Sequence, residues 1–287
     1  MIAVWKHELS NHFHSLTAYI FSAFLLAFVG LGAMLYNIQS AVANFEYVLS
    51  FVCLGFVVII PILTMKVIAE ERRQKTDQLL YSLPITTSQI IIGKYLALLI
   101  VYLVPIMIIS FYPLIFSGFG EVYLLTSYGS MFAFFMMGAA LMAIGTFISS
   151  LTDNLGFAAG ITIPVILLNY YSVTLAEYVS STAIGSAAAL IVAAVILGFV
   201  IQHLTRNDKL AFGIGAVLSI AIAGLFAMDS AGFEGLLPDI MTKLSLFERF
   251  YKFVNGVFDL TGIVYYMTVI VFFLFLSVQS LEKRRYN

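Results

Sequence analysis

Six charged side chains crowd into one short segment of a strongly apolar chain. Within residues 70–78 these are Glu70, Glu71, Arg72, Arg73, Lys75 and Asp77. Long apolar stretches flank the segment on both sides. A membrane protein concentrates charge in this way where a soluble partner docks, or where chemistry takes place at the membrane surface. The function depends on which of these two interpretations holds.

Nucleotide chemistry on this chain is not expected. A phosphate-binding loop requires the pattern G-x-x-x-x-G-K-[ST]. The Gly-Lys pair of the sequence, Gly93-Lys94, has Ser88 at the position of the first glycine and Tyr95 after the lysine. This chain is therefore not expected to hydrolyse nucleotide by itself.

A membrane-embedded hydrolase is one alternative. Glu70-Glu71, followed by Lys75 and later by Phe199-x-x-x-His203, resembles the glutamate–histidine pattern of CAAX-type intramembrane proteases. Such a set would bind a metal or activate water. Lys75 stands where that family has arginine, and the second downstream histidine is missing, so the pattern is incomplete.

A carrier or channel working alone is a second alternative. Carriers place ionisable or strongly polar groups near the middle of the membrane. Here the middles of the apolar stretches hold only Asn169, Thr162, Thr64 and a few serines. Asn169 either lines a path or makes an interhelical hydrogen bond, and the second use is more common. The N-terminal histidines lack a recognised metal-ligand spacing; they are His7, His12 and His14.

The composition indicates an integral membrane protein. The 287 residues are 62% apolar and 10% charged, with a mean hydropathy of +1.03, whereas a soluble domain is about 25% charged. A membrane-spanning helix needs about 20 apolar residues. We therefore predict an all-α polytopic bundle of eight transmembrane helices. The expected spans are residues 17–37, 47–68, 89–117, 124–150, 155–176, 182–203, 210–228 and 261–281.

Charge asymmetry predicts the orientation of these spans. If both termini are cytoplasmic, eleven of the fourteen Lys and Arg residues lie inside and only Lys243, Arg249 and Lys252 lie outside. A net charge of −1 gives no reason to expect a nucleic-acid partner. Residues 3–15 form an amphipathic helix at the inner surface, and residues 229–260 contain short helices at the outer face.

The charged segment continues into an apolar flank. We predict a helix over residues 69–83, stopped by Pro84, and a capping box formed by Thr86 and Gln89 that opens the next span. A short polar helix between two spans can act as a lever for a soluble partner, or it can serve only to fix topology. Farther along, Gly156 and Gly160 predict close helix packing; we expect packing within the chain, with a subunit interface as the second use.

Several of these motifs together resemble ABC-2-type exporter permeases, in particular the gliding-motility and copper-maturation-like permeases. The resemblance rests on the acidic pair, the basic pair, Thr76, Asp77, Leu79-Leu80, Pro84 and Gly93-Lys94, and on blocks at residues 247–260 and 281–286. Gln74-Lys75 departs from the family, which commonly has a small residue before the threonine.

The resemblance implies a permease subunit of an ATP-driven exporter in a bacterial cell membrane. Its domain would span residues 1–287, with an elbow helix at 3–15, a cytoplasmic coupling helix at 70–84 and an extra helical pair at 182–228. Its partners would be two copies of a cytoplasmic ATPase, a second permease and membrane lipid. ATP and Mg²⁺ would bind to the ATPase, and this chain would need no cofactor of its own. The expected ATPase-coupling residues are Glu70, Glu71, Arg72, Arg73, Thr76, Asp77, Leu79, Leu80, Leu83 and Pro84.

Overall fold

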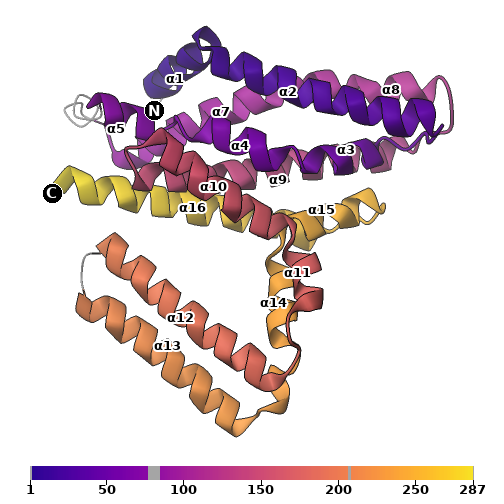
Figure 1. The fold of residues 1–287 in the computed structure, drawn as a ribbon. Helices are drawn as coiled ribbons and strands as arrows, with labels where there is room; N and C mark the ends of the chain where they lie inside the picture. The colour runs from indigo at the N-terminus through magenta and orange to yellow at the C-terminus, as the bar shows by residue number, and fades with distance from the viewer. Residues whose placement is uncertain (1, 77–84, 206–207, 287) are drawn as a thin grey trace. The chain divides into compact units, whose positions relative to one another are not determined.

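The computed structural model describes residues 2–76, 85–205 and 208–286 (Figure 1). All regular structure in these ranges is helical, as predicted. The helices fall into two compact units. The first unit comprises residues 1–168 and 249–287, and the second comprises residues 169–248.

The first unit contains most of the helices. They are α1 (Ile2–His14), α2 (Leu16–Gly32), the π-helix η1 (Ala33–Gln39), α3 (Glu46–Cys53), α4 (Phe56–Thr64), α5 (Ala69–Gln74), α7 (Thr87–Ile109), α8 (Phe111–Ser117), α9 (Leu124–Leu151) and α16 (Leu260–Tyr286). Two further helices, α10 (Leu155–Tyr170) and α15 (Leu246–Val254), carry the chain from one unit to the other.

Helix α9 forms the core of the first unit and packs against α4, α7 and α16. Its glycines leave room for its neighbours. A Cβ at Gly138 would stand 2.5 Å from the Tyr102 hydroxyl, and one at Gly145 would collide with Thr64. The small residues of α9 therefore fix how closely α4 and α7 approach it.

Two tyrosines lock α7 onto α9. Tyr95 and Tyr102 lie seven residues apart, so they occupy the same face of the helix. Their hydroxyls donate hydrogen bonds to the carbonyls of Ala139 and Phe134, each at 2.9 Å. Buried hydroxyls require such partners, and here the partners set the register between two long helices.

The second unit is built around a helical hairpin of α12 and α13. Its helices are α11 (Ser172–Tyr178), α12 (Ala183–Thr205), α13 (Asp208–Met228), the short η2 (Ala231–Phe233) and α14 (Leu236–Leu244). Asn169 bridges the break after α14: its amide nitrogen donates to the Leu244 carbonyl at 3.2 Å and its oxygen accepts from the Leu246 amide at 3.0 Å. Asn169 thus makes the interhelical hydrogen bonds that the sequence favoured.

Among the described residues, four helical stretches are long and apolar enough to cross a membrane. They agree with the first, third, fourth and last predicted spans: Leu16–Gln39, Thr87–Ser117, Leu124–Leu151 and Leu260–Arg284. Two interrupted pairs raise the number to six if each pair counts as one span: Glu46–Cys53 with Phe56–Gln74, and Leu155–Tyr170 with Ser172–Tyr178. The apolar stretches of α12 and α13 are shorter, so eight spans remain a prediction.

The second predicted span, residues 47–68, is bent rather than straight. Its two halves meet at 63°. Gly55 lies in the break, where a glycine weakens helix formation by about 1 kcal/mol. Pro61 lies inside α4 and cannot donate a backbone hydrogen bond. The weak point in the sequence and the observed bend therefore coincide.

The predicted internal packing at Gly156 and Gly160 is wrong for the described residues. A Cβ at Gly160 would meet no atom within 4 Å, and one at Gly156 would meet only the Asn154 side chain at 3.3 Å. Both glycines are exposed.

Candidate functional site at helix α5

Helix α5 carries the first part of the charged segment. Its first turn holds Glu70 and Glu71, and its last turn holds Arg72 and Arg73. Acidic groups are favourable at a helix N-terminus and basic groups at a C-terminus. The order of charges in the sequence therefore suits a helix that begins at Ala69.

A serine from a distant helix caps the start of α5. The Ser149 hydroxyl, on α9, accepts hydrogen bonds from the backbone amides of Ile68 at 3.2 Å and Ala69 at 3.1 Å, and donates to the Met65 carbonyl at 3.1 Å. Ile68 occupies the N-cap position and has no side-chain oxygen to do this itself. The beginning of α5 is thus fixed to the end of α9.

The end of α5 differs from the prediction. The helix expected over residues 69–83 ends at Gln74, because Lys75 adopts the left-handed conformation with φ of 57°. The amides of Lys75 and Thr76 return to the carbonyls of Arg72 at 3.1 Å and Glu71 at 3.0 Å. This is the hydrogen-bond pattern of a Schellman cap, in which glycine is usual at the position of Lys75.

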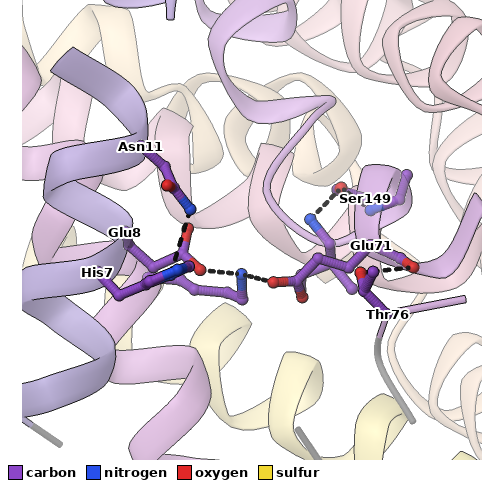
Figure 2. Close-up of polar contacts among 9 residues, drawn as sticks. His7, Glu8, Asn11, Glu71, Thr76 and Ser149 are labelled. Carbon is purple, nitrogen blue, oxygen red and sulfur yellow. Dashed lines mark hydrogen bonds and ion pairs between the residues drawn. The ribbon is translucent and has the colours of Figure 1, made fainter. Parts of the chain in front are cut away.

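Buried Lys94 joins three segments of the chain. Its side chain is only 2% exposed, and its Nζ lies 2.6 Å from Glu71 Oε1 of α5 and 2.7 Å from Glu8 Oε1 of α1. Figure 2 shows Glu8 and Glu71 approaching from opposite sides. Lys94 itself belongs to α7. We call Glu8, Lys94 and Glu71 the ion triad.

The ion triad requires that α1 lie close against α7, and Gly93 permits this. A Cβ at Gly93 would stand 3.2 Å from Val4 Cγ1 and 3.4 Å from the Trp5 amide nitrogen. A larger side chain would push α1 away. Gly93 therefore lets α1 approach α7 closely enough for Glu8 to pair with Lys94.

The ion triad would be costly to break because the charge of Lys94 is buried. Desolvation of an isolated ion costs several kcal/mol, and only excellent geometry with opposite charges offsets it. Both contacts have the short distances of charge-assisted hydrogen bonds. Loss of Lys94 would leave two carboxylates facing each other.

The other predicted coupling residues divide into described and undescribed ones. Arg72 is buried, Arg73 is exposed, and the Thr76 hydroxyl donates to the Glu71 carbonyl at 3.3 Å. Glu70 lines a polar cleft that is described below. The remaining five, Asp77, Leu79, Leu80, Leu83 and Pro84, lie outside the described residues. Beyond them, the capping box of Thr86 and Gln89 is confirmed at the start of α7.

The C-terminal helix is fastened to the same end of α9. The Ser280 hydroxyl donates to the Ser150 carbonyl at 2.9 Å, and Arg284 pairs with Asp153 at 2.7 Å. The hydrogen bond from Arg284 lowers the pKa of Asp153, and the charge of Arg72 adds to this. Both members of the Arg284–Asp153 pair are exposed, so it adds little stability.

A polar cleft opens beside the ion triad. Its volume is about 740 Å³, and its walls come from α1, the start of α2, the turn before α5, α5 itself and α7. Figure 2 places His7 and Asn11 on the α1 side and Thr76 beyond Glu71. Ionised and neutral polar side chains thus line one recess at the ends of several apolar helices.

Hydrolytic and metal chemistry gain no support from this arrangement. In the described ranges, no three or more His, Cys, Asp or Glu side chains are grouped to hold a metal ion. The Glu71 carboxylate is engaged by Lys94. His203 lies in α12, where its side chain is outside the described part of the chain.

Sequence reasoning missed Glu8, Lys94 and Ser149. For Lys94 a signal was present, since it is the one charged residue within predicted span 89–117. A lone charge in an apolar span needs a partner. Glu8 and Ser149 lie 86 and 80 residues from their contacts, and no local pattern marks them.

The comparison with protein families agrees with the motifs. The family model described as ABC-2 family transporter protein matches residues 33–176, just over half of the chain. The match includes α5, Lys94 and Ser149. None of the curated proteins matches the chain, and none of the solved structures does. The chain therefore belongs to the ABC-2 transporter family, a family of membrane transport components.

Proposed function

We infer that this chain is the permease subunit of an ATP-driven exporter whose energy comes from a separate cytoplasmic ATPase. The observation that carries this function is the attachment of α5. A short, charged helix between two apolar spans is bound at its start by Ser149 and in its middle by Lys94. Family membership supports association with an ATPase in general.

The attachments of α5 define a mechanical route. A displacement of α5 by the ATPase would act on α9 through Ser149, and on α7 and α1 through the ion triad. Close-packed interiors transmit such displacements rather than absorb them. Glu70, Glu71, Arg72, Arg73 and Thr76, with undescribed residues 77–84, form the proposed docking segment.

The topology proposed for this function follows from charge. With eight spans and both termini in the cytoplasm, the docking segment faces the ATPase, and eleven basic residues lie on that side. A second permease and two ATPase copies would complete the complex in the cell membrane. The translocation path would then run between the two permeases.

The function is tested by joint expression with the ATPase encoded beside this chain. We expect a stoichiometric complex on purification, and ATP hydrolysis that rises when both subunits are present in nanodiscs. Replacing Leu79 and Leu80 by Asp should abolish the complex and the rise in hydrolysis, because charge disrupts an apolar contact. Phe119→Asp, at an exposed position between α8 and α9, is the matched control and should leave both unchanged.

Two outcomes would contradict the proposal. One is an intact, fully active complex carrying the two Asp substitutions. The other is substrate movement by the purified chain alone, which would return the stand-alone carrier to consideration.

A further inference from the structure

The cleft beside α5 contains two opposite charges that the ion triad does not use. Lys66 Nζ donates to the Thr17 hydroxyl at 3.0 Å, which is a neutral partner. Glu70 lies in the first turn of α5. Both side chains line the cleft, yet within the described chain they form no ion pair with each other or with any other residue.

The cleft lies where several apolar helices begin or end. Thr17 is in the first turn of α2, Lys66 follows the end of α4, and Lys94 is in the second turn of α7. Helices that cross the hydrocarbon end near the lipid head groups. A recess shared by three such ends is therefore at the depth of the head groups.

We propose that this cleft binds the head group of an aminophospholipid, with the lipid phosphate against Lys66 and the lipid ammonium against Glu70. Lys66 and Glu70 line one recess without pairing, so they suit a ligand that carries a negative and a positive group on one short chain. A phosphate next to a primary ammonium, as in phosphatidylethanolamine, is such a ligand. The volume of about 740 Å³ lies within the range of small-molecule sites.

The lining favours this lipid over other common ones. A quaternary ammonium, as in phosphatidylcholine, has no N–H to donate to the Glu70 carboxylate. Phosphatidylglycerol has no cation, so Glu70 would repel it. Next to the cleft-lining Thr17, the side chains of Leu16, Tyr19 and Ile20 are 77%, 57% and 53% exposed, which provides an apolar surface for acyl chains.

The test uses the full chain in detergent and its single tryptophan, Trp5, which follows the cleft-lining Val4. Trp5 emission is recorded while short-chain phosphatidylethanolamine, phosphatidylcholine or phosphatidylglycerol is added, and native mass spectrometry counts the retained lipids. We expect phosphatidylethanolamine to bind about tenfold more tightly than the other two, the gain of a hydrogen bond between charged groups.

Two variants test which side chain binds the ammonium and which binds the phosphate of the lipid. Glu70→Gln should remove the preference for phosphatidylethanolamine over phosphatidylcholine, and Lys66→Gln should weaken all three lipids. Glu121→Gln, an exposed carboxylate between α8 and α9, is the matched control and should bind like the parent. Circular dichroism checks that each variant keeps its helical content.

The proposal is overturned by equal binding of the three lipids, or by an unchanged preference in Glu70→Gln. It is also overturned if free phosphoethanolamine binds as tightly as the lipid, which would identify a soluble ligand. None of these outcomes affects the ATPase proposal, because complex formation is measured separately.

Discussion

Carboxylates near the two ends of α9 are stabilised in different ways. Near its end, Ser149 caps α5 beside the ion triad, where Glu71 and Glu8 share the ammonium of Lys94. Ser127, near its start and about 33 Å away along the helix, donates to the carboxylate of Glu46 at 2.9 Å. Glu46 is only 2% exposed.

Neutral donors surround Glu46. Its second oxygen accepts from the Asn44 side chain at 2.8 Å, two residues earlier in the chain. The hydrogen bonds of Glu46 therefore need only the loop before α3 and the start of α9. The ion triad, in contrast, forms only when α1, α5 and α7 are all in place. The Glu46 end is therefore a local clamp, whereas the Lys94 end joins three separate helices.

Replacing Lys94 should have the largest effect. Lys94→Met leaves two partly buried carboxylates, Glu8 and Glu71, without a cation, and should lower the free energy of unfolding by about 3 kcal/mol, the low end for a broken buried pair because water still reaches both carboxylates. Thermal unfolding in detergent measures this loss. Adding Glu8→Gln and Glu71→Gln to Lys94→Met removes the excess charge and should restore most of the stability, but not ATP-driven activity. Restored activity in the triple variant would show that the ion triad serves stability only.

Glu46 provides the contrasting test. Glu46→Ala leaves Asn44 and Ser127 without their acceptor and should cost about 1–3 kcal/mol. Glu46→Gln keeps the shape and one acceptor, so its midpoint of unfolding and its activity should stay close to the parent values. If Glu46→Gln keeps its stability but loses activity, the charge of Glu46 has a role beyond the clamp.

Replacing Ser149 or Ser127, one near each end of α9, should have a smaller effect on stability. Ser149→Ala removes the cap of α5 and should cost about 1 kcal/mol, and Ser127→Ala should cost a similar amount. Only Ser149→Ala should weaken the coupling between ATP hydrolysis and transport, measured in nanodiscs. Equal losses of coupling in both variants would remove the functional distinction between the two ends.

The smallest effect that we expect is on the pH dependence of stability, and it comes from His12 beside the ion triad. Burial lowers the pKa of His12 from its ordinary value of 6.5; Glu8 and Glu70 oppose this, while Lys94 and Lys66 reinforce it. The unfolded chain therefore binds the proton more readily, so stability falls as the pH drops below about 6.5 and levels off below the folded pKa. His12→Gln should flatten this part of the profile, measured as apparent Tm against pH. An unchanged slope would mean that His12 does not cause it.

Local patterns predicted the elements better than the contacts between them. The capping box at Thr86 and the long apolar helices follow from neighbouring residues, and both are present. The end of α5 was missed because Lys75 takes a conformation that favours glycine. The ion triad was missed because it joins residues that are 23 and 86 positions apart, a distance that no local periodicity covers.

The cap that Ser149 provides can form only late in the synthesis of the chain. Chains are made from the N-terminus at about 5–20 residues per second, so α5 leaves the ribosome several seconds before the serine that completes its first turn. Until α9 has inserted and packed, the amides of Ile68 and Ala69 lack their acceptor. If the proposed ATPase recognises only the finished helix, it would join only permeases whose central helix is already in place, and the cap would then act as a checkpoint for assembly.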